Sequence, residues 1–420
     1  MIKHIFKTLA SVGIFVLCLT SAFSQTNSDV LTLDAAGERL LQKNLSLEAA
    51  RLEVSAAQQA RVFARLRPRP GLTVSAENLR VAGETPFNRL YEVGAVVTKP
   101  IPLGGQTRAR TEVADRTVGL AEARLDNVLR LRLFEMRRTF FEALLAQTRL
   151  GIEEENSRNF DGLLRYSETR LKEGDISPGE VLKLRLERIK YDSAIANARL
   201  NLRLAKIRLL ELLGETDFTR IEQIALRETF DFRQFDLNLA ALKQTALENR
   251  PEIKIAEADL ARSESVFRLE TARGKGEIEP FAGYRRVGVD NTVLAGVNIP
   301  LPFGNRNQAA IAQAEADRKI AATAVQQTKN RTSAEIETAF LAFETSREQL
   351  KAYETGFLEQ ADESLRIAVL SYREGAIDLL NLLEAQRTRT DVRSSYYQTL
   401  LTYYTNLFQL ELLTGTEIKK

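Results

Sequence analysis

Residues 181–212, VLKLRLERIKYDSAIANARLNLRLAKIRLLEL, carry an apolar seam that indicates how this chain folds. Apolar side chains recur at alternating steps of three and four residues from Val181 to Leu212, and only Arg188 interrupts them. Residues 382–413 repeat the seam, with Arg389 at the equivalent step. A 3.5-residue period held over about four heptads is typical of coiled-coil packing. Both segments are therefore predicted to be long helices that pack against partner helices.

The two seams belong to a longer internal repeat. Four segments of the first half recur in the second half in the same order: residues 31–47 match 237–253, residues 102–105 match 302–305, residues 172–176 match 373–377, and residues 212–214 match 413–415. The offsets vary only from 200 to 206. Ordered matches at one spacing indicate a duplicated unit. We expect residues 25–220 and 221–420 to be two copies of one structure.

Each copy is predicted to contain a helix, two short strands, a very long helix, a turn and a long return helix. Residues 107–173 contain no proline and are rich in Ala, Leu, Arg and Glu. As continuous helix they would extend roughly 100 Å, at about 1.5 Å per residue. Residues 305–373 repeat this pattern, with Gly356 as a candidate irregularity. The chain is therefore expected to be mainly α-helical and elongated.

Four short segments alternate apolar and polar residues, as half-buried strands do. They are residues 72–77, 91–98, 281–286 and 293–299, with loops at 80–90 and 287–291 closing two hairpins. No apolar run after residue 24 approaches the roughly 20 residues of a membrane helix. Strands cross a membrane only in a closed barrel, which needs about eight or more of them. The pattern alone leaves two alternatives open: a small soluble sheet, or a barrel to which several chains contribute four strands each.

The first 24 residues have the features of a secretory signal peptide. Lys3 and Lys7 precede an apolar run at residues 9–19, and Ala22-Phe23-Ser24 forms a small-x-small cleavage site. Residues 1–24 are therefore predicted to be removed on export. An uncleaved anchor and lipidation of Cys18 are the alternatives, although the bulky Val16-Leu17 pair before Cys18 is unusual for lipidation.

The composition excludes most enzyme classes. The chain has one His and one Cys, His4 and Cys18, and both lie in the predicted signal peptide. The exported chain therefore has no Ser-His or Cys-His pair and no His- or Cys-based metal site. The chain has 59 Lys and Arg residues against 56 Asp and Glu residues. It therefore lacks the excess of positive charge that is typical of a nucleic-acid-binding protein. The acidic run at residues 153–155 is interpreted as a solvated helix face. We expect no catalytic residue, cofactor or metal site.

Several short segments together resemble the TolC family of outer-membrane efflux proteins. They are Asn-Leu-Ser-Leu at 44–47, Arg-Pro-Glu-Ile at 250–253, Pro-Ile-Pro-Leu-Gly-Gly at 100–105, Pro-Leu-Pro-Phe-Gly-Asn-Arg-Asn-Gln at 300–308, and the two Gly-x-Ile turns. Residues 299–314 most resemble the metal-efflux, CzcC-like branch. Each motif is short, but their order and spacing cover nearly all of the exported chain.

The resemblance implies a homotrimer in the outer membrane of a Gram-negative-type bacterium. Three chains would supply twelve strands to one transmembrane barrel in contact with outer-membrane lipid, and twelve long helices to a tunnel across the periplasm. Pro102 and Pro302 would mark the change from strand to helix. The implied partners are a periplasmic adaptor protein and an inner-membrane pump of the RND type. The protein itself would be a passive duct without a cofactor, because the pump supplies the free energy.

The two turns at the far helix ends, residues 171–177 and 372–378, are the candidate functional sites. Each reverses a helix through a glycine. In the family such tips meet the adaptor, so the resemblance assigns docking to Gly174, Asp175, Ile176, Ser177, Gly375, Ala376 and Ile377. The alternative is that they are helix reversals alone.

Residues 377–382 resemble the aperture segment at the closed end of the family's tunnel. Asp378 takes the place of the first of two acidic residues, and Asn381 takes the place of the second. Three Asp378 carboxylates brought together in a trimer would raise one another's pKa and favour a cation or a dilating partner. The alternative is that Asp378 only caps the return helix.

The predicted function is that of an exit duct for heavy-metal cations such as zinc, cobalt, cadmium, copper or silver, or for other small toxic compounds. Without His, Cys and nearly all Met, the duct would not bind such ions through soft ligands, so the pump would select them. Drug efflux and type I protein secretion are the alternatives within this class. A periplasmic coiled-coil tether and a carboxylate-only secreted hydrolase are the alternatives of other classes.

Overall fold

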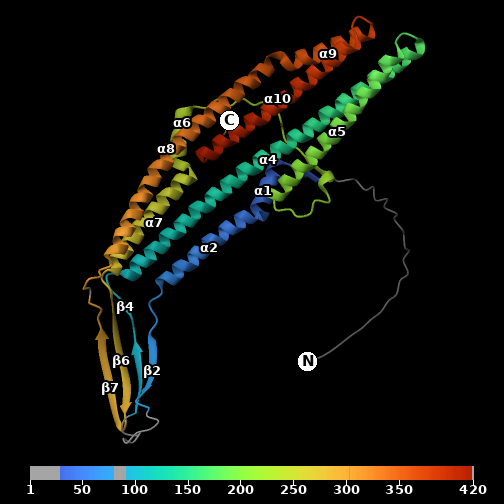
Figure 1. Ribbon diagram of the computed structural model, residues 1–420. Helices are drawn as coiled ribbons and strands as arrows, with labels where there is room; N and C mark the ends of the chain where they lie inside the picture. Colours follow the sequence, from blue (N-terminus) through green and yellow to red (C-terminus); the bar gives the residue numbers. More distant parts are fainter. Residues whose placement is uncertain (1–28, 80–90, 302, 419–420) are drawn as a thin grey trace, which may run out of the picture.

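The computed structural model describes residues 29–79, 91–301 and 303–418. Long helices lead from a small sheet at one end of the molecule to two helical tips at the other (Figure 1). The predicted signal peptide with Cys18, the predicted loop at 80–90 and Pro302 lie outside the described residues.

The order of elements repeats along the chain. The first half contains α1 (Leu33–Lys43), α2 (Leu45–Arg65), β2 (Gly71–Glu77), β3 (Glu92–Thr98), α4 (Gln106–Glu173) and α5 (Pro178–Leu212). The second half contains α6 (Leu239–Asn249), α7 (Pro251–Arg273), β6 (Glu277–Val287), β7 (Asp290–Asn298), α8 (Gln308–Ala352), α9 (Leu358–Arg373) and α10 (Leu379–Thr414). This order supports the proposed duplication, and its boundary at residues 220 and 221 stays a prediction.

The single helix predicted before each hairpin is in fact two helices. Asn44 ends α1 and caps α2, because its Oδ1 accepts the Leu47 N–H at 3.1 Å while its Nδ2 donates to the Leu212 carbonyl at 2.8 Å. In the second half the break falls between Arg250 and Pro251, where the proline begins α7. Proline lacks the N–H that would continue the helix, but it is well suited to the first helical position.

The long outgoing helices differ between the halves. α4 is one continuous helix of 68 residues. Its counterpart in the second half is divided into α8 and α9 by a π-helical segment, Tyr353–Phe357. Within this segment Gly356 has φ of 113°. The irregularity predicted at Gly356 is therefore confirmed. Glycine fits this position because L side chains rarely adopt such a φ.

The predicted seams face their partner helices. Val181, Leu184 and Leu209 of α5 are buried, as are Leu382 and Leu410 of α10. α5 packs on α4, and α10 packs on α9 and α8. These pairs form two helical hairpins that extend toward the tips (Figure 1).

The main core lies where the two halves meet, midway along the helices. Phe140 and Phe141 of α4 pack there with Phe343 of α8 and with Tyr403 and Tyr404 of α10. A short parallel pair, β1 (Asp29–Leu31) with β5 (Ile224–Leu226), joins the halves beside this core. Burial raises the pKa of Tyr404 to about 12. Its hydroxyl group donates to the carbonyl of Asp231 at 2.8 Å, so the buried tyrosine is hydrogen-bonded.

The sheet at the far end is antiparallel, with the strand order β2-β3-β6-β7. The register aligns Leu72 with Val97, Ala282 and Ala295, and it aligns Val74 with Ala95, Tyr284 and Val293. Cross-strand partners point to the same side, so the apolar positions of all four strands share one face. Val74 is 70% exposed and Val293 is 85% exposed. The single chain therefore leaves this face uncovered.

The predicted strands need three corrections. The third strand extends over eleven residues, Glu277–Val287, because β3 and β7 pair along both of its edges. The predicted loop at 287–291 shortens to Gly288 and Val289, and Gly288 adopts φ of 56° in this tight turn. A further two-residue strand, β4 (Ile101–Pro102), extends the β6 ladder toward the helices. None of the helices in the described part of the chain is both long enough and apolar enough to cross a membrane.

Candidate functional site

The two predicted tips lie next to each other at the end of the molecule farthest from the sheet (Figure 1). Gly174 ends α4 with φ of 83°, and Gly375 follows α9 with φ of 74°. The residue after each glycine donates a hydrogen bond to the preceding helix. The N–H of Asp175 donates to the Arg170 carbonyl at 2.9 Å, and the N–H of Ala376 donates to the Ser371 carbonyl at 2.8 Å. A Cβ at either glycine would meet nothing within 4 Å. Only the left-handed backbone, not crowding, therefore requires glycine at the tips.

The return helices begin with side-chain caps. Ser177 Oγ accepts the N–H of Glu180 at 3.3 Å, and Asp378 Oδ1 accepts the N–H of Asn381 at 2.9 Å. The structure thus brings the two predicted aperture residues together as a helix cap, with both side chains exposed. Capping and lining an aperture are compatible, because a carboxylate that caps through one oxygen retains another for a ligand. The aperture role stays a prediction.

A groove of about 900 Å³ separates the two tips and continues along α5 and α10. Five of the nine predicted residues line it: Ile176, Ser177, Gly375, Ile377 and Asp378. The other four, Gly174, Asp175, Ala376 and Asn381, lie outside its lining.

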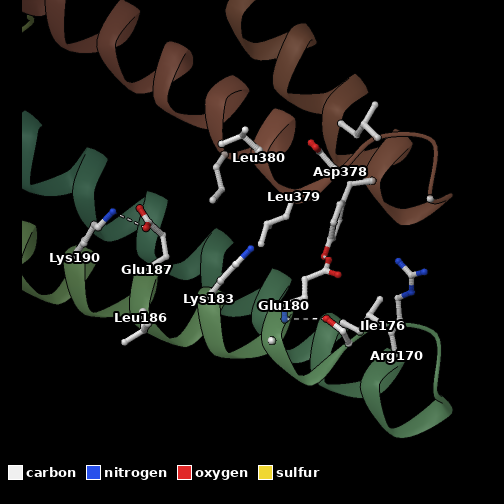
Figure 2. Close-up of a pocket in the computed structure, with 16 residues that line it drawn as sticks. Arg170, Ile176, Glu180, Lys183, Leu186, Glu187, Lys190, Asp378, Leu379 and Leu380 are labelled. Atoms are coloured by element: carbon white, nitrogen blue, oxygen red, sulfur yellow. Dashed lines mark hydrogen bonds and ion pairs between the residues drawn. The ribbon is translucent and has the colours of Figure 1, made fainter.

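The walls of the groove combine apolar and charged side chains. Leu379 and Leu380 extend from α10 toward α5, and Lys183 extends from α5 toward them (Figure 2). Further from the tip, Lys190 pairs with Glu187 at 2.7 Å along the same wall. A partner that enters this groove would need an apolar ridge with polar flanks.

A hydrogen bond that the sequence analysis missed connects the two hairpins at the groove. The buried Tyr372 of α9 donates through its hydroxyl group to Glu180 Oε1 of α5 at 2.6 Å. Burial raises the pKa of Tyr372, and the hydrogen bond to Glu180 raises it further. The hydroxyl therefore keeps its proton at neutral pH and acts as the donor. In sequence, Glu180 has the pattern of a capping box with Ser177, which gave no indication of a partner 192 residues away.

Arg373 of α9 contacts α4 within the same chain. Its guanidinium group lies over the ring of Tyr166 at 5.6 Å, and its carbonyl accepts the Tyr166 hydroxyl at 3.1 Å. This second contact also joins α9 to α4. Two contacts thus join the hairpins near their tips, Tyr372 with Glu180 and Tyr166 with Arg373.

The arginines that interrupt the seams form ion pairs farther from the tips. Arg188 pairs with Asp161 at 2.5 Å, and Arg389 pairs with Asp362. Each aspartate lies 27 residues before its arginine, so both halves contain the same contact. A coiled-coil seam therefore accommodates each arginine because an acidic side chain of the opposing helix neutralises it.

The acidic run at residues 153–155 is only partly the solvated face that was predicted. Glu155 accepts hydrogen bonds from Arg389 at 2.8 Å and from Arg393 at 3.0 Å, and so links α4 to α10. Burial alone would raise the pKa of Glu155, but these arginines outweigh it and lower the pKa. Burial raises the pKa of Glu153. The solvated-face prediction is wrong for Glu155, because the second hairpin covers it.

No metal site is evident in the part of the chain that the structure describes, where no three His, Cys, Asp or Glu side chains are grouped to hold an ion.

The profile of a protein family described as "Outer membrane efflux protein" matches residues 36–215 and 242–416. The chain belongs to this family. It is therefore an outer-membrane efflux protein of the TolC and CzcC type and not an enzyme.

Individual relatives agree with this assignment. The chain is 27% identical to the cobalt-zinc-cadmium resistance protein CzcC of Cupriavidus metallidurans, over 94% of this chain and 93% of that protein. It is 24% identical to nodulation protein T of Rhizobium leguminosarum bv. trifolii, over 69% of this chain and 64% of that protein. These similarities extend across both halves of the efflux protein.

Solved structures share the fold. CusC superposes with a TM-score of 0.73 at 20% identity, covering 91% of this chain and 92% of that one. The CmeC outer-membrane channel of Campylobacter jejuni superposes with a TM-score of 0.76 at 17% identity, covering 91% of this chain and 85% of that one. At such low identities the superpositions establish the fold of this efflux protein and not its substrate.

Proposed function

We propose that three copies of this chain form one exit duct, in which the sheets close into a twelve-stranded outer-membrane barrel and the helices enclose a periplasmic tunnel. The observation that carries this proposal is the sheet register, which gathers the apolar side chains of four strands on one uncovered face. β2 and β7 are the two edges of this sheet, and among the described residues each has a single paired neighbour. Pairing β2 of one copy with β7 of the next would satisfy both edges.

The helices also support assembly. Leu182, Leu186 and Ile189 of α5 are each nearly 60% exposed, although they are large apolar side chains. Their spacing of four and three residues continues the heptad pattern on the side away from α4. A neighbouring copy would cover this second stripe. Closed threefold symmetry uses the same contact three times.

The tips are the proposed contact with a periplasmic adaptor, which in turn would connect the duct to an inner-membrane pump of the RND type. The groove beside the tips supports this part of the proposal, because it offers Leu379 and Leu380 between charged flanks. The proposed docking residues are Gly174, Asp175, Ile176, Ser177, Gly375, Ala376 and Ile377. Asp378 would line the entrance next to them.

The proposed substrates are heavy-metal cations. The similarity to a cobalt-zinc-cadmium resistance protein supports this class over drugs and secreted proteins. After removal of the predicted signal peptide with His4 and Cys18, the duct would let such ions pass without retaining them through His or Cys, so selection would belong to the pump.

Two measurements test the proposal. Light scattering on the protein extracted from outer membranes should give about three times the mass of one chain, and a soluble monomer would contradict the duct and favour a periplasmic tether.

Deletion of the gene should sensitise cells to zinc, cobalt or cadmium. Sensitisation to drugs alone, or loss of a secreted protein, would replace the metal assignment with one of the two alternatives.

A further inference from the structure

The helices meet the sheet at the end of the molecule opposite the tips (Figure 1). A second groove lies at this junction. Its volume is about 890 Å³. It is formed by the link from α2 to β2, by the link from β3 to α4 and by the first turns of α4. The hydrogen bonds of Arg110 fix these parts together, because its guanidinium donates to the carbonyls of Ala64 at 2.9 Å and Leu66 at 2.6 Å.

The groove carries an excess of positive charge. Four basic side chains line it, Arg65, Arg67, Lys99 and Arg108, against the two acids Glu112 and Asp115. Both acids are already engaged, since Glu112 accepts from Arg268 at 2.6 Å and Asp115 lies within 3.8 Å of Arg61 and Arg65. Within the described residues, the side chains of Arg67, Lys99 and Arg108 have no acidic partner within ion-pair distance. Three exposed cations of the described chain therefore line one groove without an ion-pair partner.

The backbone places this groove at the edge of the apolar sheet face. The N–H of Lys99 donates to the Pro280 carbonyl at 3.0 Å, so Lys99 continues the β3–β6 ladder beyond Thr98. Residues two apart on a strand point to the same side, which puts Lys99 on the face of Val97. The exposed Ile101 follows in the same groove. The cations thus begin where the apolar surface ends.

We propose that this groove binds the phosphate headgroup of an anionic phospholipid from the periplasmic leaflet of the membrane. The inference rests on the proposed function, which puts the apolar sheet face in contact with lipid. Guanidinium groups match phosphate oxygens in a bidentate geometry, and an ammonium group supplies a compact charge. A lipid whose tails lie against Val97 and the rest of the apolar sheet face would have its phosphate beside Lys99. The headgroup would thereby fix the depth of the duct in the membrane.

The test uses the full exported chain, purified as its detergent-solubilised assembly. Native mass spectrometry would follow binding of phosphatidylglycerol, with phosphatidylcholine as the zwitterionic comparison and inorganic phosphate as a competitor. The variant is the triple change Arg67→Gln, Lys99→Gln and Arg108→Gln. The matched control removes three exposed basic side chains from helix surfaces outside the groove: Arg124→Gln, Arg208→Gln and Lys254→Gln.

Wild-type protein should prefer phosphatidylglycerol over phosphatidylcholine. The affinity should fall about fivefold for Arg67→Gln alone and up to roughly 100-fold for the triple variant, because each basic side chain contributes separately near an anionic surface. The control variant should bind as wild type does, and both should keep their assembled mass. Equal affinity for the two lipids, or equal loss in the control, would overturn the site. Displacement by millimolar inorganic phosphate would identify a free-anion site instead. A wild-type protein recovered as a soluble monomer would overturn the duct as well, so the two failures are distinguishable.

Discussion

Substitution of Tyr372 by phenylalanine should loosen the contact between the two helical hairpins. It removes only the hydroxyl group that donates to Glu180 Oε1 at 2.6 Å. A hydrogen bond to a charged group contributes about 1.5–3 kcal/mol, and the lower end applies here because Glu180 is partly exposed and water can replace the donor. About 1.4 kcal/mol corresponds to a tenfold change in an equilibrium constant. We therefore expect the population with separated tips to rise roughly tenfold.

The separation of the tips can be measured directly with labels on introduced cysteines. The exported chain would have no cysteine of its own, because Cys18 lies in the predicted signal peptide. Spin labels on cysteines introduced at Glu187 and Leu380 would report the width of the groove between the tips. Single-channel recordings in planar bilayers would report open probability. Tyr191→Phe is the matched control, since that side chain packs on Phe160 within the first hairpin and does not cross the groove. An unchanged label distance and open probability in Tyr372→Phe, or the same change in Tyr191→Phe, would refute the reasoning.

Three further predictions concern the tips and the links between helices. Gly375→Val should abolish efflux while Gly375→Asn retains most of it, because φ of 74° excludes β-branched side chains and tolerates Asn; efflux retained in Gly375→Val would remove the docking assignment. Asp378→Ala should destabilise the start of α10 by about 1 kcal/mol and also alter cation preference in bilayers, and loss of stability with unchanged conductance would leave Asp378 as a cap only. Because the pKa of Glu155 is lowered in the folded state, its ion pairs should stabilise the protein above the ordinary pKa of 4.5 and lose this effect as the pH falls through the lowered value. Thermal unfolding from pH 6 to pH 3 should thus be less pH-dependent in Glu155→Gln, and identical profiles would contradict the role of this carboxylate.

Periodicity predicted the helical architecture correctly. The seam at residues 181–212, the long proline-free run before it and the irregularity at Gly356 all depend on contacts between neighbours in sequence, and each was found. The breaks at Asn44 and Pro251 were not predicted, although the repeat had aligned Asn44 with Arg250, the residue before Pro251. Both breaks could have been predicted from local sequence, because Asn favours the N-cap and Pro favours the first position of a helix.

The candidate site was predicted in part for the same reason. Glycines that reverse a helix and the capping Asp378 are local features, so the sequence located the tips. Tyr372 and Glu180 were missed because their hydrogen bond joins residues 192 apart. Glu155 was misjudged because a run of three acids resembles a solvated face until a second hairpin covers it.

The sequence by itself determined where helices, strands and turns occur, because propensity, period and capping act over a few residues. Only the tertiary structure decided which faces meet. The register that gathers the apolar side chains of four strands on one side depends on pairing between β3 and β6, strands nearly 200 residues apart. The same pairing sets Lys99 at the rim of that surface, beside two arginines from other segments. Such positions follow from packing and long-range hydrogen bonds, which no local pattern encodes.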